Sequence, residues 1–506
     1  MGRALSGMVA VAAAAHPHKA ALVAGERTVT YAELHARVLR TAGALAELGV
    51  TKGDRVATLL GTVPEFVEVL HGAWRLGGVV APLNVMLTPD EAGYVLADAE
   101  ARVVVVDRAL LPVVLAVRDR LAKLDHVVVV GGRAPRRTQA YEKLLARSPE
   151  PPSVEVKEDD LALLAYTAGT TANPKGAMLT HGNLMANLDQ MSEVPALREA
   201  ESDVVLLALP LFHIYALNVV LGITIREGAT AVLAERFDPV GTLELVERHR
   251  VTVLFGTPPM FAAWLRAADQ REFDLSSVRM AVSGAAALPG AVFRAFRERF
   301  GVTIWEGYGL TETAPAVTTN ALGGEPRPDS IGLALPGVEV RLVDEHGQEV
   351  EEGDPGEIVV RGPNVFAGYW RKPEESGASL RDGWFRTGDV AYRDEDGYLH
   401  IVDRARDLVI VSGFNVYPKE VEDAIVVHPA VAECTVIGVP DERTGEAVKA
   451  IVVPVRAADL TEEDVLEHCR GRLARFKWPR EVEIVSELPK HITGKVLRRR
   501  LRESGP

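Results

Sequence analysis

The sequence predicts an α/β protein with a large N-terminal body of α/β-layered subdomains, a β-rich module, and a small α+β lid at the C-terminus. In the first ~400 residues, short β-branched runs alternate with helical patterns, which is typical of parallel sheets covered on both faces. From Gly337, polar and apolar residues alternate between turns rich in Gly and Asp, as in antiparallel sheet. A compact mixture of both element types follows Asp403. We therefore expect a body at 1–402, a hinge at 403–407 and a lid at 408–506.

Each expected element rests on its own residue pattern. Apolar residues at helical spacing predict body helices at 31–48 and 65–76, and another helix from His181. Buried-strand patterns lie at 55–60, 79–83, 101–106, 126–130, 204–209, 230–233, 251–255 and 278–283. The β-rich module is expected to contain strands at 339–343 and 357–361. The lid is expected to contain helices at 419–427 and 462–474, with strands at 433–438, 448–453 and 481–485.

Composition and charge exclude several classes of protein. The 506 residues include 56 Lys and Arg against 70 Asp and Glu, and the net charge of −14 argues against a protein that coats nucleic acid. No apolar run approaches the ~20 residues that span a membrane. The two cysteines, Cys434 and Cys469, lie outside any CxxC pair or Cys/His cluster. This excludes a structural zinc site and predicts a reducing, cytoplasmic setting.

The C-terminal end is basic although the chain as a whole is acidic. Between positions 470 and 502 there are 11 Lys and Arg against 3 Glu, a local balance of +8. A solvated helix face and a local site for an anionic ligand are both consistent with this pattern.

The most informative segment is a loop of small, hydroxylated residues at 163–177, between an apolar strand and a helical pattern. Such a loop can wrap a polyphosphate, because glycine lets the backbone approach, hydroxyl groups donate, and a lysine supplies positive charge. It is not a Walker A loop, which requires Gly-Lys-Ser/Thr, since here Lys175 precedes Gly176. An exposed loop without a ligand is the alternative interpretation.

A second segment, at 307–313, combines glycines with an acidic residue. Gly307 and Gly309 on either side of Tyr308 would form a flat slot. Thr311 could bond a phosphate oxygen, and Glu312 is a hard oxygen ligand suited to Mg²⁺. A Gly-rich turn with a helix cap is the alternative.

Three more segments carry candidate functional residues. Asp389, on a tight turn at 384–390, could accept both hydroxyls of a ribose, and a plain turn is the alternative. A charged stretch precedes a strand and a Gly-Phe turn within 403–420. Lys495 stands on a glycine turn in the basic segment 488–499.

These five segments, in this order, resemble those of the acyl-adenylate-forming superfamily of AMP-forming acyl-CoA synthetases, adenylation domains and firefly luciferase. The resemblance extends from Thr30 to Lys495, and the chain looks most like bacterial medium- and long-chain fatty acyl-CoA synthetases. It implies an enzyme that converts a carboxylic acid and ATP to acyl-AMP and pyrophosphate, and then transfers the acyl group to the thiol of CoA. ATP, Mg²⁺ and CoA are the implied cofactors and co-substrates.

The resemblance also implies a role for each matching residue in nucleotide and CoA binding. The implied contacts are Thr167, Gly169, Thr170, Thr171 and Lys175 for the β- and γ-phosphates, Gly284, Ala285, Ala286, Gly307, Tyr308 and Gly309 around adenine, Asp389 and Arg404 for the ribose, and Gly413 and Phe414 for the pantetheine tunnel. Glu312 and Thr170 are implied as metal-site residues.

Five residues are implied to take part in catalysis or lid movement. Thr311 contacts the α-phosphate and Glu312 lies beside Mg²⁺. Lys495 corresponds to a lid lysine that stabilises charge between the carboxylate and the α-phosphate, and the lid rotates after adenylation about a pivot that matches Arg406. His213 matches an aromatic gate near the acyl site, and a satisfied core histidine is the alternative.

The phosphate loop departs from the family pattern at two positions. The family loop usually reads Ser-Gly-Thr-Thr-Gly, and here Ala168 and Ala172 replace the serine and the final glycine. Ala168 removes one hydroxyl donor, and a hydrogen bond to a charged group is worth about 1.5–3 kcal/mol. Ala172 removes positive-φ freedom. Weaker handling of ATP is therefore one expectation.

The resemblance places the acyl-pocket walls in the apolar segments 215–218, 255–258, 282–284 and 314–317. None of these segments contains Lys or Arg, so a fatty or aryl acid is favoured over a dicarboxylate, which would need a buried cation. Ala216 and Gly256 are expected to leave room for a long acyl chain. The alternatives are a ligase that loads a carrier protein and a non-catalytic relative, and a homodimer is a further candidate assembly.

Overall fold

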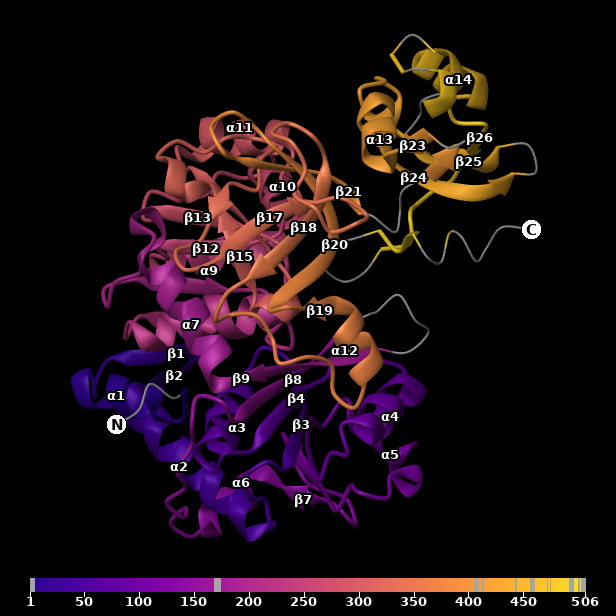
Figure 1. Cartoon of the computed structure of the whole chain (residues 1–506). Helices are drawn as coiled ribbons and strands as arrows, with labels where there is room; N and C mark the ends of the chain where they lie inside the picture. The colour runs from indigo at the N-terminus through magenta and orange to yellow at the C-terminus, as the bar shows by residue number, and fades with distance from the viewer. Residues whose placement is uncertain are drawn as a thin grey trace. The chain divides into compact units, whose positions relative to one another are not determined.

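The computed structural model of the chain describes residues 5–167, 174–404, 409–411, 414–441, 444–455, 460–470, 472–473, 475–490, 496–498 and 501. The chain forms two compact units. One comprises Met1–Glu339 and Val360–Phe385, and the other comprises Val340–Val359 and Arg386–Pro506 (Figure 1). The hinge predicted at 403–407 lies mostly outside the described residues and stays a prediction.

The first unit contains a seven-stranded sheet with the strand order β7-β6-β5-β3-β4-β8-β9. Its neighbouring strands are parallel except for the antiparallel pair β8–β9. The strands are β3 (Arg55–Leu59), β4 (Val79–Pro82), β5 (Val103–Asp107), β6 (His126–Val130), β7 (Gln139–Ala140), β8 (Leu161–Thr167) and β9 (Lys175–Thr180).

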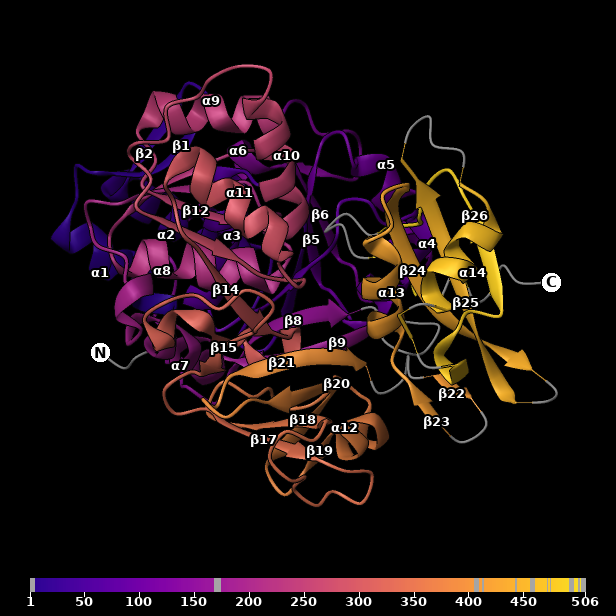
Figure 2. The ribbon, with the colours of Figure 1, turned by 90° about the horizontal axis from the view of Figure 1, so that it is seen from above.

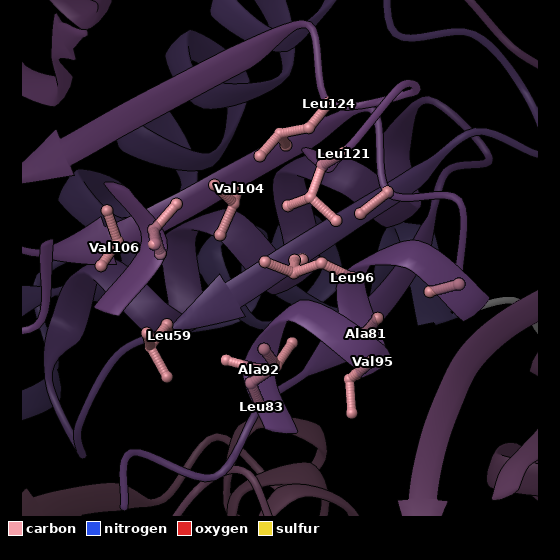
Figure 3. Packing of buried hydrophobic residues seen from close by; sticks show 14 of the residues in the cluster. Leu59, Ala81, Leu83, Ala92, Val95, Leu96, Val104, Val106, Leu121 and Leu124 are labelled. Atoms are coloured by element: carbon pink, nitrogen blue, oxygen red, sulfur yellow. The ribbon is translucent and has the colours of Figure 1, made fainter. Parts of the chain in front are cut away.

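Helices cover both faces of this sheet, as near-continuous apolar strands require. They are α2 (Tyr31–Glu47), α3 (Pro64–Arg75), α4 (Pro89–Asp98), α5 (Leu111–Leu115) and α6 (Tyr141–Arg147). Because successive strand residues point to opposite faces, Val104 and Val106 belong to the same buried cluster as Leu96 of α4 (Figure 3), whereas Val105 packs on the side of α2 and α6. Thr30 begins α2 with a capping box, in which its hydroxyl accepts from the backbone of Glu33.

The same unit contains a nine-stranded sheet with the order β16-β15-β14-β13-β12-β10-β11-β1-β2. The run from β14 to β1 is parallel, and the two ends are antiparallel. The strands are β1 (Ala20–Ala24), β2 (Arg27–Thr30), β10 (Val204–Leu207), β11 (Thr230–Leu233), β12 (Val253–Gly256), β13 (Met280–Ser283), β14 (Ile304–Gly309), β15 (Ala316–Thr319) and β16 (Leu333–Ala334). The carboxyl ends of β12, β13 and β14 therefore lie at one edge, where ligand sites of α/β sheets form.

Helices α9, α10 and α11 pack side by side next to this sheet (Figure 2). The helices of this part are α1 (Met8–Ala15), α7 (His181–Ser192), α8 (Ile223–Arg226), α9 (Pro239–His249), α10 (Pro258–Ala268) and α11 (Gly290–Phe300). A π-helical segment, Tyr215–Gly222, precedes α8.

The β-rich module and the C-terminal region each have a five-stranded sheet. The module sheet has the order β17-β18-β20-β19 with β21 on β20, and its elements are β17 (Glu339–Val343), β18 (Gly356–Arg361), α12 (Pro373–Ser379), β19 (Leu380–Arg381), β20 (Trp384–Arg393) and β21 (Leu399–Arg404). The C-terminal sheet has the order β23-β22-β25-β24 with β26 on β25, and its elements are β22 (Val409–Val411), β23 (Phe414–Val416), α13 (Pro418–Val426), β24 (Val431–Asp441), β25 (Gly445–Pro454), α14 (Glu462–Arg470) and β26 (Glu481–Ile484).

The α/β class, the β-rich module and every predicted element are confirmed, and the differences lie at element ends. The strand predicted from position 251 begins at Val253 because Val251 still belongs to the end of α9. There Arg250 has a φ of 52°, and the Val251 N–H donates to the Val246 carbonyl. Cys434 and Cys469 are both free thiols. None of the helices in the described ranges is long and apolar enough to cross a membrane.

Candidate active site

The ends of the predicted phosphate loop are held together by a β-hairpin. Thr167 ends β8, Lys175 begins β9, and the two residues pair directly in the antiparallel ladder. The middle of the loop, with the predicted residues Gly169, Thr170 and Thr171, lies outside the described residues. The structure thus brings Thr167 and Lys175 opposite each other where the apolar strand ends.

The other edge of β9 is covered by a segment that sequence reasoning missed. The N–H of Met178 donates to the Gly368 carbonyl and the N–H of Ala367 donates to the Met178 carbonyl, both at 2.9 Å. The N–H of Trp370 donates to the Gly176 carbonyl at 2.8 Å. Residues 366–370 therefore extend the hairpin sheet and place Tyr369 beside the start of β9.

Tyr369 contacts two of the predicted site residues. Its hydroxyl donates to Glu312 Oε1 at 2.8 Å, and Lys175 Nζ lies 5.3 Å from the centre of its ring. Burial, followed by the nearby Glu312 carboxylate, raises the pKa of Tyr369 above its ordinary value. The hydroxyl therefore stays protonated as a donor. One aromatic side chain thus links the predicted metal ligand to the predicted phosphate-binding lysine.

Glu312 lies on a short 3₁₀ turn, Thr311–Thr313, between β14 and β15. The residue is 8% exposed, and the Phe366 N–H donates to the Glu312 carbonyl at 2.9 Å. Thr311 is half-buried on the same turn. Gly309 is required beneath the turn, because a Cβ there would lie 2.0 Å from the Pro315 carbonyl oxygen. The predicted alternative, a Gly-rich turn, is compatible with this geometry as well.

Three buried asparagine side chains fix the chain that follows Glu312. Each donates through Nδ2 to a backbone carbonyl: Asn364 to Thr313 at 2.8 Å, Asn218 to Ala314 at 2.7 Å, and Asn187 to Ala316 at 2.8 Å. Buried carbonyl groups need such partners, so the amides hold this turn in one conformation.

The two segments predicted to frame adenine are joined by a buried carboxyl group. Gly284 follows β13, and Ala285 and Ala286 are exposed, with Ala285 at a φ of 70°. The N–H of Leu288 donates to Glu306 Oε1 at 3.0 Å. Glu306 immediately precedes Gly307 and Tyr308 in β14, so its side chain connects one segment to the other.

The buried carboxyl group of Glu306 should make the folding stability depend on pH, and we expect substitution by glutamine to remove that dependence. The residue is 3% exposed, and burial raises its pKa to about 8 from an ordinary 4.5. Between these values the unfolded chain is ionised while the folded chain holds the proton, so folding stability falls as pH rises from about 4.5 to about 8. We expect the Glu306→Gln variant to gain about 2–4 kcal/mol relative to wild type between pH 5 and pH 8, at 1.36 kcal/mol per pKa unit. Urea unfolding at both pH values measures this gain.

The matched control for this prediction is Glu298→Gln, on the exposed side of α11. It should shift both unfolding curves equally. Parallel pH dependence of Glu306→Gln and wild type would contradict the assigned titration.

Three of the four segments predicted to wall the acyl site meet around Tyr215. Its hydroxyl donates to the Val282 carbonyl at 3.2 Å, and its ring lies 6.1 Å from that of Phe255. A Cβ at Gly284 would lie 3.2 Å from the Tyr215 ring. His213 packs against Phe212, with ring centres 4.7 Å apart, and its carbonyl accepts from Leu217. The gate role of His213 stays a prediction.

The expectation that Gly256 leaves room for a long acyl chain is wrong. A Cβ at Gly256 would lie 3.1 Å from the Phe261 ring and 3.3 Å from the Trp264 ring. Glycine stands there because two buried aromatic rings occupy the adjacent space. Ala216 is fully buried within the π-helical segment.

In the second unit, Asp389 and Arg404 are direct partners in the antiparallel ladder of β20 and β21. Asp389 is 5% exposed, and its N–H donates to the Thr387 hydroxyl at 3.1 Å. The preceding Gly388 has a φ of 73°, and its N–H donates to Glu357 Oε1 at 3.1 Å. The two residues predicted to bind the ribose are therefore adjacent in the backbone register.

Several predicted site residues lie outside the described residues. They are Gly169, Thr170, Thr171, Arg406, Gly413 and Lys495. Phe414 begins β23, where it pairs with Val411. The roles of these residues stay predictions.

The chain is similar to known proteins over almost its whole length. Residues 9–370 match the model of the AMP-binding enzyme family, and residues 420–495 match that of the AMP-binding enzyme C-terminal domain. The chain is 41% identical to a feruloyl-CoA synthase of an Amycolatopsis species, with 96% of each chain covered. It is 35% identical to a long-chain-fatty-acid–CoA ligase of Bacillus subtilis, covering 99% of this chain and 94% of that protein.

Solved structures of similar proteins share the fold and the sequence. The ATP-bound structure of MatB from Rhodopseudomonas palustris is 36% identical, with a TM-score of 0.92 over 100% of this chain and 99% of that chain. The structure of the anthranilate CoA ligase AuaEII with anthranoyl-AMP is 32% identical, with a TM-score of 0.91 over 99% and 97% of the two chains. The chain therefore belongs to the AMP-binding enzyme family, as its five motifs predict, and is an ATP-dependent, AMP-forming acyl-CoA synthetase.

Proposed function

We propose that the chain joins a medium- or long-chain fatty acid to CoA at the site built around Glu312 and Lys175. In the first step, a carboxylate oxygen of the acid attacks the α-phosphorus of ATP, the bond from that phosphorus to the oxygen bridging the β-phosphate breaks, and pyrophosphate leaves. In the second step, the CoA thiol loses its proton to solvent and attacks the acyl carbon, and AMP leaves. The observation that carries the proposal is the contact of Tyr369 with both Glu312 and Lys175.

The first step brings anions together, so positioning and electrostatic stabilisation would supply most of the catalysis. Lys175 would place its ammonium group on the β- and γ-phosphates. Thr311, one residue before Glu312, would bond the α-phosphate. Asp389 and Arg404, which pair in one ladder, would hold the ribose hydroxyls. Lys495 would bring positive charge to the oxygen atoms that react.

The described residues also fit a Mg²⁺ ion. Glu312 offers a hard carboxylate oxygen on a fixed turn. Among the described residues, no group of three or more His, Cys, Asp or Glu could hold a metal by itself. This donor set suits an ion that takes most of its ligands from water and substrate phosphates. When bound, Mg²⁺ would neutralise negative charge on those phosphates.

We also propose the predicted domain organisation, with a body at 1–402, a hinge at 403–407 and a lid at 408–506. A pivot at Arg406 would let the lid bring Lys495 to the first step and Gly413 with Phe414 to the second. The two cysteines, which are free and not disulfide-bonded, support a reducing, cytoplasmic compartment.

Two observations support an acid with an apolar body. The four segments predicted to wall the acyl site contain no Lys or Arg that could neutralise a second carboxylate. The chain is also similar to a long-chain-fatty-acid–CoA ligase over almost its whole length. An aryl acid is the second candidate, favoured by the Tyr215 ring that lies across these walls and by the similarity to a feruloyl-CoA synthase.

A substrate panel separates the two candidate acids. We expect CoA thioester formation with octanoate, decanoate or palmitate to exceed that with benzoate, cinnamate or ferulate. Product is measured by chromatography at equal acid concentrations. The opposite order would replace the fatty acid with an aryl acid. Thioester formation only with a holo-carrier protein, and not with free CoA, would identify a carrier-loading ligase.

The Tyr215→Ala variant tests which acid the walls accept. Removing the ring takes away an aromatic contact worth about 0.5–1.5 kcal/mol and opens space between Gly284 and Phe255. We expect kcat/KM for palmitate relative to cinnamate to rise about 10-fold. The Tyr215→Phe variant keeps the ring and should leave the ratio unchanged. An unchanged ratio in Tyr215→Ala would show that this ring does not line the acyl site.

A further inference from the structure

We propose that Tyr369 is a positioning residue that orients the metal-binding carboxylate of Glu312 through its hydroxyl and the phosphate-binding ammonium of Lys175 through its ring. This inference rests on the proposed function, because it assigns Mg²⁺ to Glu312 and phosphate to Lys175. Tyr369 itself would touch neither the metal nor the reacting atoms.

The hydroxyl part of the proposal rests on two bonds that fix Glu312. Tyr369 Oη donates to Glu312 Oε1 at 2.8 Å, and the backbone of Phe366 holds the Glu312 carbonyl. A hydrogen bond to a carboxylate is charge-assisted and directional. Partners that orient a metal ligand in this way typically contribute 10- to 100-fold to metal affinity or activity.

The ring part rests on the position of Lys175 at the start of β9. Its ammonium nitrogen lies 5.3 Å from the ring centre, within the range of a cation–π interaction. The residue has a flexible four-carbon side chain, so a contact that restricts it lowers the entropy lost when phosphate binds. The aromatic face thus favours the conformation in which the Lys175 ammonium lies over the Tyr369 ring, whose hydroxyl holds Glu312.

The position of the ring is itself well determined. The Tyr369 N–H donates to the Ser376 hydroxyl at 2.8 Å, and Phe366 packs edge-on at 4.9 Å between ring centres. Backbone bonds from Ala367 and Trp370 to β9 anchor the segment on both sides. Because the ring is fixed, its contacts restrict the positions of the Glu312 carboxylate and the Lys175 ammonium group.

The chain offers a matched tyrosine–glutamate pair away from the proposed site. Tyr141 Oη donates to Glu68 Oε2 at 2.8 Å, and both residues are buried. Tyr141→Phe therefore removes a bond of the same kind and length. It reports what the loss of such a bond does to stability alone.

The experiment measures binding of α,β-methylene-ATP by calorimetry, once with Mg²⁺ and once with EDTA. The ratio of the two affinities is the magnesium enhancement. The proteins are wild type and the Tyr369→Phe, Tyr369→Leu and Tyr141→Phe variants, each checked by thermal unfolding. Tyr369→Phe keeps the ring and removes only the hydroxyl, so it preserves the packing of the segment.

We expect Tyr369→Phe to lower the magnesium enhancement about 10-fold, with little change in the affinity measured in EDTA. Tyr369→Leu should also weaken binding in EDTA by several-fold, because Lys175 loses its aromatic contact. Tyr141→Phe should lower the unfolding temperature and leave both affinities unchanged.

Two outcomes would overturn the inference. One is a Tyr369→Phe variant with the full wild-type magnesium enhancement. The other is a Tyr141→Phe variant that loses as much enhancement as Tyr369→Phe, since the effect would then come from general destabilisation. Failure of wild type to bind the nucleotide would instead overturn the proposed function, and the positioning role with it.

Discussion

The Lys495→Ala variant is expected to form acyl-AMP about 100- to 1,000-fold more slowly than wild type, the range observed when one transition-state donor is removed. The carboxylate and the α-phosphate are both anionic, and charge accumulates between them as the new bond forms. Under the proposed lid rotation, Lys495 would reach this position only in the closed state, and it would therefore stabilise the transition state more than bound ATP. We therefore expect kcat of adenylation to fall while the Kd for ATP changes little. Single-turnover formation of acyl-AMP without CoA measures the rate.

The control for Lys495 is a lysine in the same basic segment. Lys490 Nζ lies 2.5 Å from Glu433 Oε2, and this partly exposed pair is worth about 0–1 kcal/mol at most. Lys490→Ala should leave adenylation unchanged. Thioester formation from chemically prepared acyl-AMP should also persist in Lys495→Ala. If Lys495→Ala adenylated at the wild-type rate, or Lys490→Ala were equally slow, the assigned role would be wrong.

The local patterns of the sequence predict the fold because they act over a few residues. Each such pattern lies within a single helix or strand. Examples are the β-branched runs at Val103–Asp107 and His126–Val130 and the capping box at Thr30. The order of the five motifs predicts that Asp389 and Arg404 act together, and the ladder of β20 and β21 makes them direct partners. Motif order reports distant pairings only because the motifs recur in a known family.

Tyr369 and Glu306 carry no local signal of this kind. Tyr369 owes its position to backbone pairing with β9, about 190 residues earlier in the chain, and sequence spacing does not reveal such pairing. Glu306 precedes a recognised motif, but its bond to Leu288 depends on the parallel arrangement of β13 and β14. An acidic residue inside an apolar strand is the one signal that could have marked it.

Gly256 shows a different limit of the sequence. A glycine beside an expected pocket can leave space for a ligand or for a neighbouring side chain. The sequence shows a glycine in both cases and does not distinguish them. Here the rings of Phe261 and Trp264 occupy the space next to Gly256, so the glycine admits side chains of the protein. Gly309 is the converse case, because the close approach of the Pro315 carbonyl explains the glycine without any ligand.

The Glu312→Gln variant is expected to lower the rate of ATP–pyrophosphate exchange about 100- to 1,000-fold at saturating Mg²⁺. Glutamine has the same shape, and its side-chain oxygen can still accept from Tyr369, while the main-chain bond from Phe366 is untouched. The local structure should therefore persist, and the unfolding temperature should change by no more than about 2 °C. What is lost is the negative charge that a hard cation prefers. Exchange of labelled pyrophosphate over a Mg²⁺ titration measures the loss and should show a higher half-saturating concentration.

Glu68→Gln is the matched control, because Glu68 is also a buried glutamate bonded to a tyrosine hydroxyl. Its carboxylate pairs with Arg37 Nε at 2.5 Å, and Arg37 also pairs with the exposed Glu142 at 2.6 Å, so removing the charge leaves the guanidinium group with only its exposed partner. Because Arg37 keeps that partner, the loss should stay below the ~3–5 kcal/mol of a fully orphaned buried charge. The two variants should therefore have opposite effects: Glu68→Gln unfolds more easily but keeps its Mg²⁺ dependence, whereas Glu312→Gln folds normally but loses it. An activity loss in Glu312→Gln that tracked only the folded fraction would remove Glu312 from the metal site and leave it a structural carboxylate of the turn.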